Sequence, residues 1–481
     1  MKHVLGLDIG GSSVKVWLTG GAIDKCPHVT LPLPLQLDPE NGRTEFDPQE
    51  WWSIIRAAIE QLLAPRGDVM PSALVISSIR QAFVLCGDSG ELGMGIHNAD
   101  RRGAISSRYV DSMLDSNDLY DLTGHWFAPQ LPLPKLVSIR TNDTERWRRI
   151  TRLMFVHDWI VWRLSGVWRN EQTLATSSQL CDIESRNWSR ELIDLFILKE
   201  EMFGELVRSG EIIGEITNSE LPYLNGVPVV AGGGDAHFLA YGSRSKSSDI
   251  VAVTGSTTPI QAISNHLPAD SCRRPWVSSS LVGSGWAVEM NAGYTGAALD
   301  WLCAMLKLPL QDALRAAWTA SDVGARGVIA LTASPKWDRE SWRGPLPFSF
   351  ARVNPGHISA DLVRAIIEAH AYAILANIEA LEDALPKNDN DLILTGGWVA
   401  DQDFGQLVAD VTQRTVSSIT SLDASITTSA YLANKNIAEI ETYNTEAIIY
   451  EPCRRDSRYS DNYHDYCQLY HHSVLGDPIR G

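Results

Sequence analysis

Short apolar runs that end in small residues recur along the chain and predict buried strands followed by tight loops. Residues 4–9 and 14–18 are two such runs, separated only by Gly10, Gly11, Ser12 and Ser13, which predicts a hairpin. Three later runs have the same form: residues 227–231 precede Gly232-Gly233-Gly234-Asp235, residues 250–253 precede Thr254-Gly255-Ser256-Thr257, and residues 391–394 precede Thr395-Gly396-Gly397. Ligands bind beyond the carboxyl ends of strands in open α/β sheets, so these four loops are candidate binding loops.

Longer stretches have a helical period. Residues 51–63 predict one helix, and residues 359–385 predict the longest one, because apolar residues recur there on one face. That face consists of Val363, Ile366, Ile367, Ala371, Ile374, Ile378 and Leu381. Residues 73–78 predict a further buried strand, and residues 100–225 are mainly helical in pattern. This mixture of elements predicts an α/β protein.

The length of the chain predicts two large domains, since 481 residues exceed what one hydrophobic core serves. The segment 243–249, SRSKSSD, is polar and lacks apolar periodicity, which favours a boundary there. We therefore expect an N-terminal domain over residues 1–245 and a C-terminal domain over residues 246–450. Residues 451–481 are polar, rich in tyrosine and weakly patterned, and predict a solvated tail. Each half begins with a strand and a small-residue turn, which is a weak internal similarity.

Composition narrows the function classes. Hydrophobic residues make up 44% of the chain and charged residues 21%, and the formal net charge of −17 argues against a nucleic-acid or anionic-membrane surface. The sequence has no apolar run of about 18 residues that would span a membrane, and no apolar leader precedes the first strand. The seven cysteines are scattered, which favours a reduced, cytoplasmic protein.

Several common motifs are missing from the sequence. A G-x-x-x-x-G-K-[ST] loop is missing, which excludes a P-loop enzyme, and no G-x-G-x-x-G follows a strand, which disfavours a nicotinamide enzyme. A G-x-S-x-G nucleophile motif is missing too. The C-terminal cysteines and histidines fit no standard zinc spacing, so a solvated tail is the favoured interpretation; they are Cys453, His464, Cys467, His471 and His472.

The first of the four loops has the chemistry of a phosphate site. Gly10 and Gly11 leave backbone N–H groups uncovered, and a concave run of such groups binds phosphate oxygens. Asp8 precedes the turn, where its carboxylate is placed to hold Mg²⁺, directly or through water. Since the chain carries a net negative charge, binding of an anionic nucleotide would need such N–H groups and a metal ion close to the phosphates. An ordinary hairpin turn, with Asp8 as a turn-forming residue, is the alternative.

The order of motifs over residues 3–455 resembles that of the FGGY carbohydrate kinases. The segments that carry the resemblance are GLDIGGSSVK, VISSIRQAFVLCGDSGELGMGIHNADRRG, LPLPKL, HDWIVWRLSG, ATSSQLCDIESRNW, VVAGGGDAH, VTGSTTPI, GYTGAALDWL and LTGGWVADQDFGQLVADV. Each segment alone is weak, whereas their order and intervals are specific for the family. The resemblance implies an α/β fold of two actin-like ATPase (ribonuclease H-like) domains with an interdomain cleft. It also implies ATP and Mg²⁺, and transfer of the γ-phosphoryl group to a hydroxyl of a sugar or polyol.

Within this resemblance Asp235 is the expected general base, which removes a proton from the substrate hydroxyl. A carboxylate that follows three glycines can be approached closely by substrate, and a base must lie within hydrogen-bond reach of the hydroxyl it activates. A cap on the helix that begins near Ala236 is the alternative, and the two roles are compatible. Asp8 and Asp235 are the expected metal ligands.

The resemblance assigns the remaining loops to ATP. Residues Gly10, Gly11, Ser12 and Ser13 should meet the β- and γ-phosphates, and a second phosphate loop should consist of Gly255, Ser256 and Thr257. Gly396 and Gly397 should leave room for the adenosine beside a helix over residues 403–411. A Ser/Thr turn is the alternative for the second loop, and a packing device is the alternative for the glycine pair.

The first domain should supply the sugar contacts. The expected contacts are Arg80, Gln81, Asn98, Asp100 and Arg101, with Arg80 and Asp100 foremost. Carboxylate and guanidinium groups suit vicinal diols because each presents two hydrogen-bonding positions. A solvated charge is the alternative for Arg101, and a turn residue is the alternative for Asn98.

Some features depart from the family pattern. The first turn has Gly-Gly where many relatives have Gly-Thr, and His237 follows the base, where it either tunes Asp235 or fills space. Residues 421–430 replace a Gly/Ala-rich helix start with bulkier residues, which either narrows the adenosine side or changes helix packing. The sugar segment lacks the Trp-Asn-Asp signature of xylulose kinases, and residues 335–350 look more like the autoinducer-2 kinases.

The sequence thus predicts an ATP-dependent kinase for a small sugar or polyol, with a ketopentose such as xylulose as first choice. A kinase for autoinducer-2 or another short linear polyol is one alternative. A catalytically weak sugar- or nucleotide-binding sensor is another, and residues 421–430 motivate it. The expected partners are ATP and a small-molecule sugar, with no nucleic acid and no membrane, and a homodimer stays open.

Overall fold

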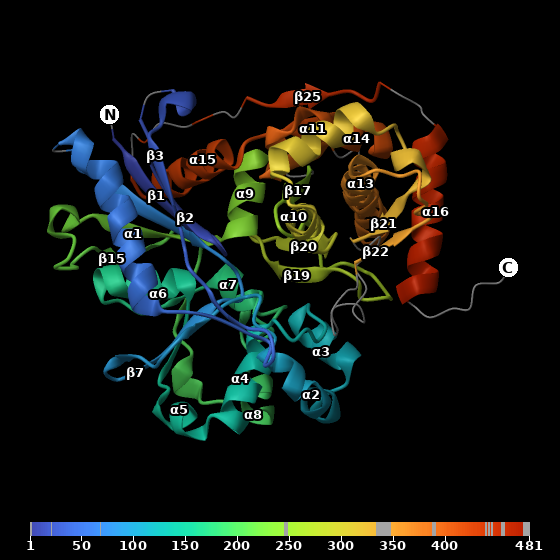
Figure 1. The fold of residues 1–481 in the computed structure, drawn as a ribbon. Coiled ribbons are helices and arrows are strands. Elements are labelled where there is room, and N and C mark those ends of the chain that lie inside the picture. The colour runs from blue at the N-terminus through green and yellow to red at the C-terminus, as the bar shows by residue number, and fades with distance from the viewer. Residues whose placement is uncertain are drawn as a thin grey trace. The chain divides into compact units, whose positions relative to one another are not determined.

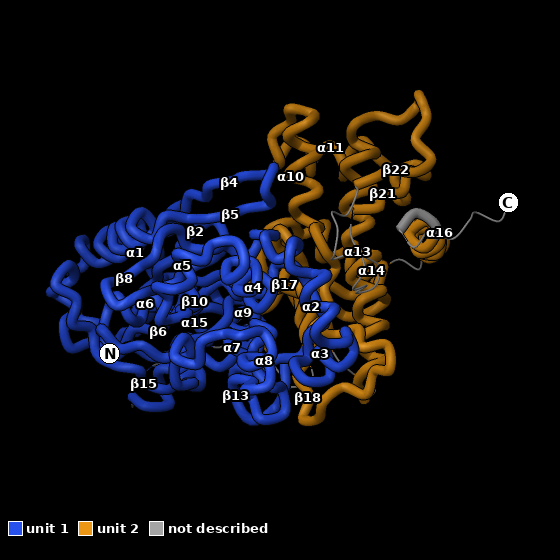
Figure 2. Tube along the Cα trace, turned by 90° about the horizontal axis from the view of Figure 1, so that it is seen from below, with its two compact units in different colours: residues 1–242, 277–287, 422–445 blue, residues 243–276, 288–421, 446–481 orange. Residues whose placement is uncertain are grey.

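The computed structural model describes residues 2–474 apart from 21, 68, 245–248, 333–347, 387–390, 438–439, 441–442, 444–445 and 454–456 (Figure 1). These residues form two compact units (Figure 2). Unit 1 comprises residues 1–242, 277–287 and 422–445, and unit 2 comprises residues 243–276, 288–421 and 446–481. Two continuous domains were expected, whereas both units are assembled from separate segments. Most of the expected boundary segment and of residues 335–350 lies outside the described residues.

Unit 1 is built on a six-stranded sheet with the order β15-β16-β6-β1-β2-β3. β1 and β2 form an antiparallel hairpin, while β1, β6 and β16 run parallel to one another. The strands are β1 (Val4–Ile9), β2 (Ser13–Leu18), β3 (His28–Pro32), β6 (Ala73–Ser78), β15 (Ile212–Glu215) and β16 (Pro228–Gly234). The predicted hairpin and the strand predicted for residues 73–78 are confirmed. Because β1, β6 and β16 are parallel, their carboxyl ends meet at one edge of the sheet.

A second sheet and a set of helices complete unit 1. This sheet has the order β10-β7-β9-β5-β4, with β8 paired to β7. Its strands are β4 (Gln36–Asp38), β5 (Arg43–Phe46), β7 (Phe83–Gly87), β8 (Gly90–Glu91), β9 (Gly95–Ile96) and β10 (Arg152–Phe155). Two short pairs are β11 (Asn170–Glu171) with β14 (Leu206–Val207), and β12 (Cys181–Asp182) with β13 (Asn187–Trp188). The helices are α1 (Pro48–Leu63), α2 (Ser107–Met113), α3 (Ser116–Thr123), α4 (Pro132–Asn142), α5 (Thr144–Arg149), α6 (Val156–Ser165), α7 (Gln172–Thr176), α8 (Arg190–Leu195), α9 (Asp235–Ser243) and α15 (Ser421–Asn434).

Unit 2 contains a sheet with the order β20-β18-β17-β23-β24-β25. The strands are β17 (Ile250–Thr254), β18 (Pro259–Ser264), β20 (Trp286–Asn291), β23 (Leu392–Gly396), β24 (Val416–Ser418) and β25 (Ile448–Tyr450). A further strand, β19 (Trp276–Ser279), leads into residues 277–287, and a short pair consists of β21 (Ile329–Leu331) and β22 (Ser349–Ala351). The helices are α10 (Thr295–Leu306), α11 (Leu310–Ala320), α13 (Ser359–Ala384), α14 (Gln402–Thr412) and α16 (Ser457–Val474). α13 confirms the helix predicted from the longest apolar period.

The main core of unit 1 consists of apolar side chains from the first sheet and from α1 and α6. The helical period of α1 buries Trp51, Ile55, Ile59 and Leu62, each 0% exposed, and this burial supplies most of the helix's stability. The Asp47 side chain caps α1 by accepting a hydrogen bond from the backbone N–H two residues later, at 2.8 Å. The core thus holds the strands whose carboxyl ends carry the predicted loops.

α15 belongs to unit 1 and contains the unusual residues 421–430. The Thr428 hydroxyl donates to the Phe238 carbonyl of α9 at 2.8 Å, and the Trp17 indole N–H donates to the Ser429 hydroxyl at 3.1 Å. A Cβ on Gly242 would lie 2.0 Å from the Ala424 carbonyl oxygen, so α9 and α15 are in close contact. The bulkier stretch therefore packs against α9 and Trp17 within unit 1.

The segment expected to be a solvated tail contains α16. Its tyrosines recur at helical spacing, and Tyr459, Tyr466 and Tyr470 are buried, Tyr466 completely. The Tyr459 hydroxyl accepts a hydrogen bond from Arg364 of α13 at 3.2 Å. Residues 451–481 were expected to be weakly patterned, whereas the spacing of these tyrosines is that of one helix face. Among the described helices, none is long and apolar enough to cross a membrane.

Candidate active site

The turn between β1 and β2 carries the first candidate group. The Gly10 N–H donates to the Ser13 carbonyl oxygen at 2.9 Å, which closes a tight loop. Asp8 lies near the end of β1, is 8% exposed, and accepts a hydrogen bond from the Ser77 hydroxyl at 2.7 Å. Burial raises the pKa of Asp8, while the charge of Lys15 and the Ser77 bond partly offset this rise. A cation bound at this carboxylate would stabilise its ionised form and so offset the cost of burying the charge.

β16 ends in the glycines that precede Asp235. The pairing of β16 with β6 shifts register before Gly233, whose φ of +114° is one that L side chains rarely adopt. A Cβ on Gly234 would lie 2.8 Å from Cγ of Arg80, so the missing side chain lets Arg80 approach. Asp235 is the first residue of α9. Its side chain is 31% exposed, and its Oδ1 lies 4.0 Å from Nε of Arg80.

A buried polar chain supports the backbone next to Asp235. The Gly234 N–H donates to the Thr173 hydroxyl at 3.0 Å, and that hydroxyl donates to the Glu171 carboxylate at 2.6 Å. The Ser209 hydroxyl donates to the other Glu171 oxygen at 2.8 Å. Glu171 is fully buried, and burial raises its pKa. These supporting residues were not predicted, because no local motif marks them.

Arg80 and Gln81 follow β6, and the structure uses them differently. Arg80 is partly exposed and faces Asp235. Gln81 is buried and has a φ of +65°, which is uncommon for a residue other than glycine. Its carbonyl oxygen accepts a hydrogen bond from the Lys135 ammonium at 3.3 Å. The local backbone therefore depends on a lysine far along the chain.

Asp100 is a buried anchor in this structure. The carboxylate is 0% exposed. One oxygen accepts from the Arg102 backbone N–H at 3.0 Å and from its Nε at 2.8 Å, and the other accepts from the Thr44 N–H at 2.9 Å and from Arg102 Nη2 at 2.8 Å. A sugar hydroxyl would have to displace one of these bonds. Asp100 was expected to be a foremost sugar contact, whereas its geometry is that of a residue that holds the loop.

The neighbours of Asp100 are more accessible. Asn98 and Arg101 are both partly exposed. The Arg101 N–H donates to the Gly42 carbonyl oxygen at 2.8 Å, which ties this segment to the loop between β4 and β5. The arginine that pairs with Asp100 is Arg102, one position after the one we singled out. Asn98 and Arg101 thus keep surface from which a ligand can be contacted.

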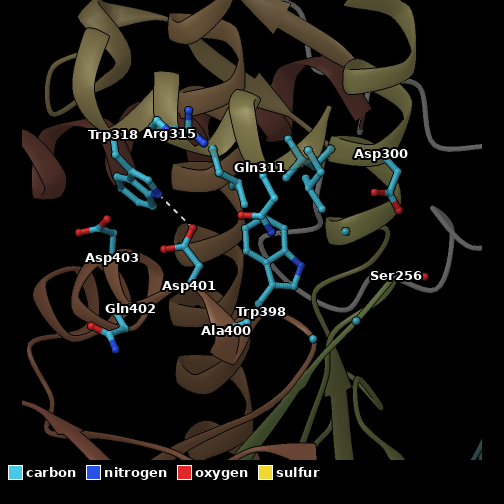
Figure 3. A pocket seen from close by; sticks show the side chains of 16 residues that line it. Ser256, Asp300, Gln311, Arg315, Trp318, Trp398, Ala400, Asp401, Gln402 and Asp403 are labelled. Atoms are coloured by element: carbon cyan, nitrogen blue, oxygen red, sulfur yellow. Dashed lines mark hydrogen bonds between the residues drawn. The ribbon is translucent and has the colours of Figure 1, made fainter. Parts of the chain in front are cut away.

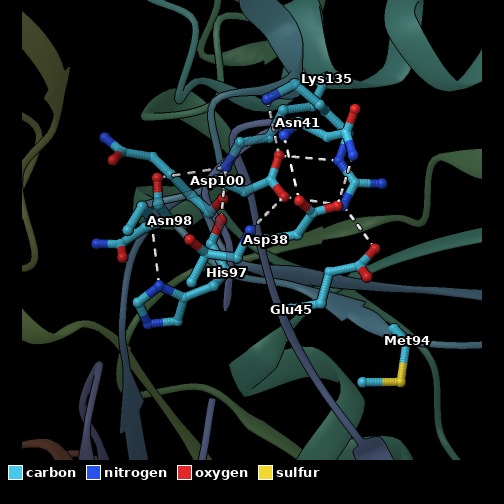
Figure 4. A network of polar contacts seen from close by, with 12 residues as sticks. Asp38, Asn41, Glu45, Met94, His97, Asn98, Asp100 and Lys135 are labelled. Atoms are coloured by element: carbon cyan, nitrogen blue, oxygen red, sulfur yellow. Dashed lines mark hydrogen bonds and ion pairs between the residues drawn. The ribbon is translucent and has the colours of Figure 1, made fainter. Parts of the chain in front are cut away.

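Lys135 holds the backbone of this region together (Figure 4). Its side chain is fully buried, and its ammonium donates to the carbonyl oxygens of His97 at 2.8 Å, Gln81 at 3.3 Å and Asn98 at 3.4 Å. Burial lowers the pKa of Lys135 to about 7, against the opposing effect of Asp100. The motif LPLPKL contains this lysine and was given no role. A lysine within an apolar run was the available signal.

The two predicted loops of unit 2 lie side by side because β17 and β23 pair in parallel. The Gly255 N–H donates to the Thr257 carbonyl oxygen at 3.0 Å, and the Gly397 N–H donates to the Thr254 carbonyl oxygen at 2.7 Å. Gly396 has a φ of +104°, and a Cβ there would lie 2.1 Å from the same Thr254 oxygen. Glycine is therefore required at position 396 for the two strand ends to meet.

A pocket of about 510 Å³ opens beside these loops in unit 2 (Figure 3). The Trp318 indole N–H donates to the Asp401 carboxylate at 3.0 Å across one wall. Apolar and aromatic walls with a few polar groups suit a flat heterocycle with polar edges. The lining residues are Gly255, Ser256, Gly296, Leu299, Asp300, Leu310, Gln311, Leu314, Arg315, Trp318, Gly397, Trp398, Ala400, Asp401, Gln402 and Asp403. Of the residues predicted for ATP in this unit, Gly255, Ser256 and Gly397 are among those that line the pocket.

A buried histidine supports the Trp398 wall. The His370 ring lies 4.8 Å from the rings of both Trp398 and Phe404, measured between centroids. Its Nε2 is 2.8 Å from the Thr258 hydroxyl. Burial lowers the pKa of His370 to about 3, so the ring is neutral at pH 7. His370 was not predicted, because its partners come from two segments that are distant from it in sequence, at Thr258 and at Trp398–Phe404.

The chain matches family models along most of its length. The model of the FGGY family of carbohydrate kinases, N-terminal domain, matches residues 3–242, and the model of the C-terminal domain matches residues 240–436. "Putative sugar kinase YoaC" of Bacillus subtilis is 26% identical over 416 residues, which cover 85% of this chain and 84% of that protein. Autoinducer-2 kinase of Salmonella paratyphi A is 24% identical over 442 residues, or 86% of this chain and 82% of that protein.

Solved structures show the same fold. The xylulose kinase of Rhodospirillum rubrum has a TM-score of 0.83 at 22% identity, with 99% of this chain and 100% of that chain covered. The fold is that of the two-domain actin-like ATPases, and the matches define an ATP-dependent kinase of carbohydrates. The chain belongs to the FGGY family of carbohydrate kinases, as its motif order predicted.

Proposed function

We propose that this kinase phosphorylates a hydroxyl of a small sugar or polyol, most simply a ketopentose such as xylulose. The observation that carries the proposal is the pair of Arg80 and Asp235, which are both partly exposed at the carboxyl edge of the unit 1 sheet with 4.0 Å between Nε and Oδ1. A carboxylate and a guanidinium offer an acceptor and two donors to neighbouring hydroxyls. The xylulose kinase of Staphylococcus epidermidis, 26% identical over 428 residues, supports the ketopentose.

Asp235 acts as the general base in this proposal. The glycines before it leave its carboxylate open to substrate, and it is the first residue of α9. It accepts the proton of the substrate hydroxyl, whose oxygen then attacks the γ-phosphorus of ATP. Thr173 and Glu171 hold the preceding peptide and so fix the position of the base.

Asp8 and Asp235 would hold Mg²⁺ together with phosphate oxygens and water. Asp8 and Gly233 both pair with Ser77, on either side of β6, so the two carboxylates belong to one sheet edge. Oxygen donors are what Mg²⁺ prefers, and it usually keeps several waters. The described residues contain no cluster of three or more histidine, cysteine or acidic ligands, which agrees with a metal held mainly by the nucleotide. The ion would neutralise charge on the phosphates.

Each unit, taken by itself, offers groups that suit parts of ATP. The turn of Gly10, Gly11, Ser12 and Ser13 and the loop of Gly255, Ser256 and Thr257 offer N–H and hydroxyl groups to phosphate oxygens. The pocket beside Gly397 offers the aromatic walls of Trp318 and Trp398 to the adenine. Arg80, Gln81, Asn98 and Arg101 would contact the sugar, and Asp100 would hold their loop.

The test is an ADP-release assay over pentuloses, tetritols, glycerol and autoinducer-2 with Mg²⁺. Turnover that is fastest with xylulose supports the proposal, and turnover that is fastest with autoinducer-2 supports the alternative suggested by that relative. A thermal shift with a sugar but no turnover with any of them supports a sensor. The motive for the sensor was residues 421–430, and these contact α9, whereas the described lining of the unit 2 pocket comes from other segments.

A further inference from the structure

Two loops of unit 1 that serve different ligands in the proposed function are joined by His97. One is the turn of Gly10, Gly11, Ser12 and Ser13, and the other is the segment 97–101. The His97 Nε2 lies 3.0 Å from the Gly11 carbonyl oxygen, and the ring is 5% exposed. The two loops are distant in sequence, so this contact is made by the tertiary fold.

The hydrogen bonds define the tautomer of His97. The Ala99 backbone N–H donates to Nδ1 of His97 at 3.2 Å, so Nδ1 is an acceptor. Nε2 therefore carries the proton and donates to the Gly11 carbonyl oxygen. Burial and the charge of Lys135 lower the pKa of His97 to about 4, so the ring is neutral at pH 7 and keeps this arrangement.

The shape of the turn matches the imidazole. A Cβ on Gly11 would lie 3.3 Å from His97 Nε2 and 3.3 Å from Cδ1 of Ile79, tighter than an ordinary contact. The missing side chain at position 11 gives the ring its place. At position 11 many relatives have threonine in a Gly-Thr pair, whereas this chain has glycine. His97 occupies the space beside that glycine.

The bond to Gly11 fixes the direction of the following amide. The peptide between Gly11 and Ser12 is planar and trans, so its C=O and N–H point in opposite directions. Because His97 holds the carbonyl oxygen, the Ser12 N–H points away from the ring. A flip of this peptide would turn an N–H that can bind phosphate into a carbonyl that repels it.

The backbone of His97 is held near the residues proposed to contact the sugar. Its carbonyl oxygen accepts from the Lys135 ammonium at 2.8 Å, and the same ammonium reaches the carbonyl oxygens of Gln81 and Asn98 (Figure 4). The His97 N–H donates to the Thr44 carbonyl oxygen at 3.0 Å. The backbones of Gln81, Asn98 and His97 are therefore held by one ammonium group.

We propose that His97 is a positioning residue that couples sugar binding to phosphate binding, an inference that rests on the proposed function. A sugar held by the segment 97–101 fixes the ring, the ring fixes the Gly11 carbonyl, and the turn then presents its N–H groups to the triphosphate. Coupling of this kind is reciprocal, so the nucleotide strengthens sugar binding by the same factor.

The experiment measures the affinity for Mg²⁺ and a non-hydrolysable ATP analogue by calorimetry, with and without a saturating sugar chosen by thermal shift. In the wild type the sugar should raise this affinity by about fivefold or more. His97→Leu should bring that ratio close to one, and His97→Gln, whose amide can donate where Nε2 does, should restore most of it. A purely structural role would lower the melting temperature and both affinities and leave the ratio unchanged.

Gly11→Ala is the second variant, in case His97→Leu does not fold. It keeps the histidine and pushes the ring away by a few tenths of an ångström, so the ratio should fall here too. A wild type whose analogue affinity no sugar changes, or a folded variant of either kind with the wild-type ratio, overturns the inference. A sugar that shows coupling but no turnover contradicts the proposed function instead, so the two failures are distinguishable.

Discussion

The sheets of the two units have the same strand order but carry different chemistry. In unit 1 the order β2-β1-β6-β16-β15 pairs antiparallel, parallel, parallel and antiparallel, and β18-β17-β23-β24-β25 does the same in unit 2. The unit 1 edge has the carboxylates of Asp8 and Asp235, whereas the corresponding strand β17 of unit 2 ends in Thr254. The edge of the unit 1 sheet thus carries two carboxylates. The strand ends of unit 2 carry uncharged glycines and hydroxyl residues beside a pocket. Topology positions loops, and the loop residues decide their chemistry.

The largest expected effect follows from removing the proposed base, Asp235, from the charged edge of unit 1. Asp235→Asn should lower kcat by about 10²–10⁴-fold, because the amide cannot accept the hydroxyl proton, and should leave sugar affinity within a small factor. Single-turnover ADP release and sugar binding by calorimetry measure the two effects. Asp88→Asn, an exposed carboxylate in the turn between β7 and β8, is the matched control. Near-normal kcat for Asp235→Asn would remove that residue from its role.

The neutral edge of unit 2 is tested by a pair of glycines. Gly396→Ala places Cβ 2.1 Å from the Thr254 carbonyl oxygen at a positive φ and should destabilise the protein by about 1–3 kcal/mol and raise the KM for ATP. Gly397→Ala places Cβ 3.9 Å from the same oxygen, an ordinary contact, and should keep stability. Thermal denaturation and ATP titrations separate the two. Equal stability of both variants would contradict the close approach of β17 and β23.

Asp8→Asn tests whether the charged edge exists to hold metal. The Mg²⁺ concentration for half-maximal activity should rise by about tenfold, equivalent to roughly 1.4 kcal/mol. Burial raises the pKa of Asp8 in the folded state. The free energy of unfolding of the wild type therefore falls as the pH rises from the unfolded-state pKa of Asp8 through its folded-state pKa. Without Mg²⁺ the variant should therefore be at least as stable at pH 7, and the difference should vanish at low pH. An unchanged Mg²⁺ titration would count against the assignment.

The smallest effect is expected at the pocket wall. Trp318→Phe removes the N–H that donates to Asp401 and keeps most of the ring. The free energy of ATP binding should therefore weaken by about 0.5–1.5 kcal/mol, and the KM for ATP should rise a few-fold. Steady-state kinetics with varied ATP measures this rise. The matched control is Trp301→Phe on α10, a ring that is 41% exposed. A larger effect in the control would mean that the pocket wall does not bind nucleotide.

Local sequence patterns were sufficient to predict the strand ends. The hairpin of β1 and β2, the strands before Gly232, Gly255 and Gly396, and α13 all follow from short-range periodicity and small residues. The candidate loops lie at these strand ends for the same reason, because parallel strands bring their carboxyl ends to one edge.

Residues that act through distant partners could not be predicted this way. Lys135 gains its role from the carbonyl oxygens of Gln81, His97 and Asn98, and Glu171 from a hydroxyl that meets β16. The burial of Asp100 could not be predicted for the same reason, since its carboxylate accepts a hydrogen bond from Thr44, which is distant in sequence. Domain membership of α15 was missed because helix periodicity does not reveal which sheet a helix covers.

The bond from Trp17 to Ser429 has a consequence for protein synthesis. The two residues are 412 positions apart, so at about 5–20 residues per second the ribosome delivers the second about 20–80 s after the first. During that interval the nascent hairpin of β1 and β2 lacks α15, whose Ile426 and Ala430 belong to the same hydrophobic cluster as Trp17. Refolding of the released chain and folding during translation should thus follow different routes, and a chaperone that shields this hairpin would have most to do before α15 emerges.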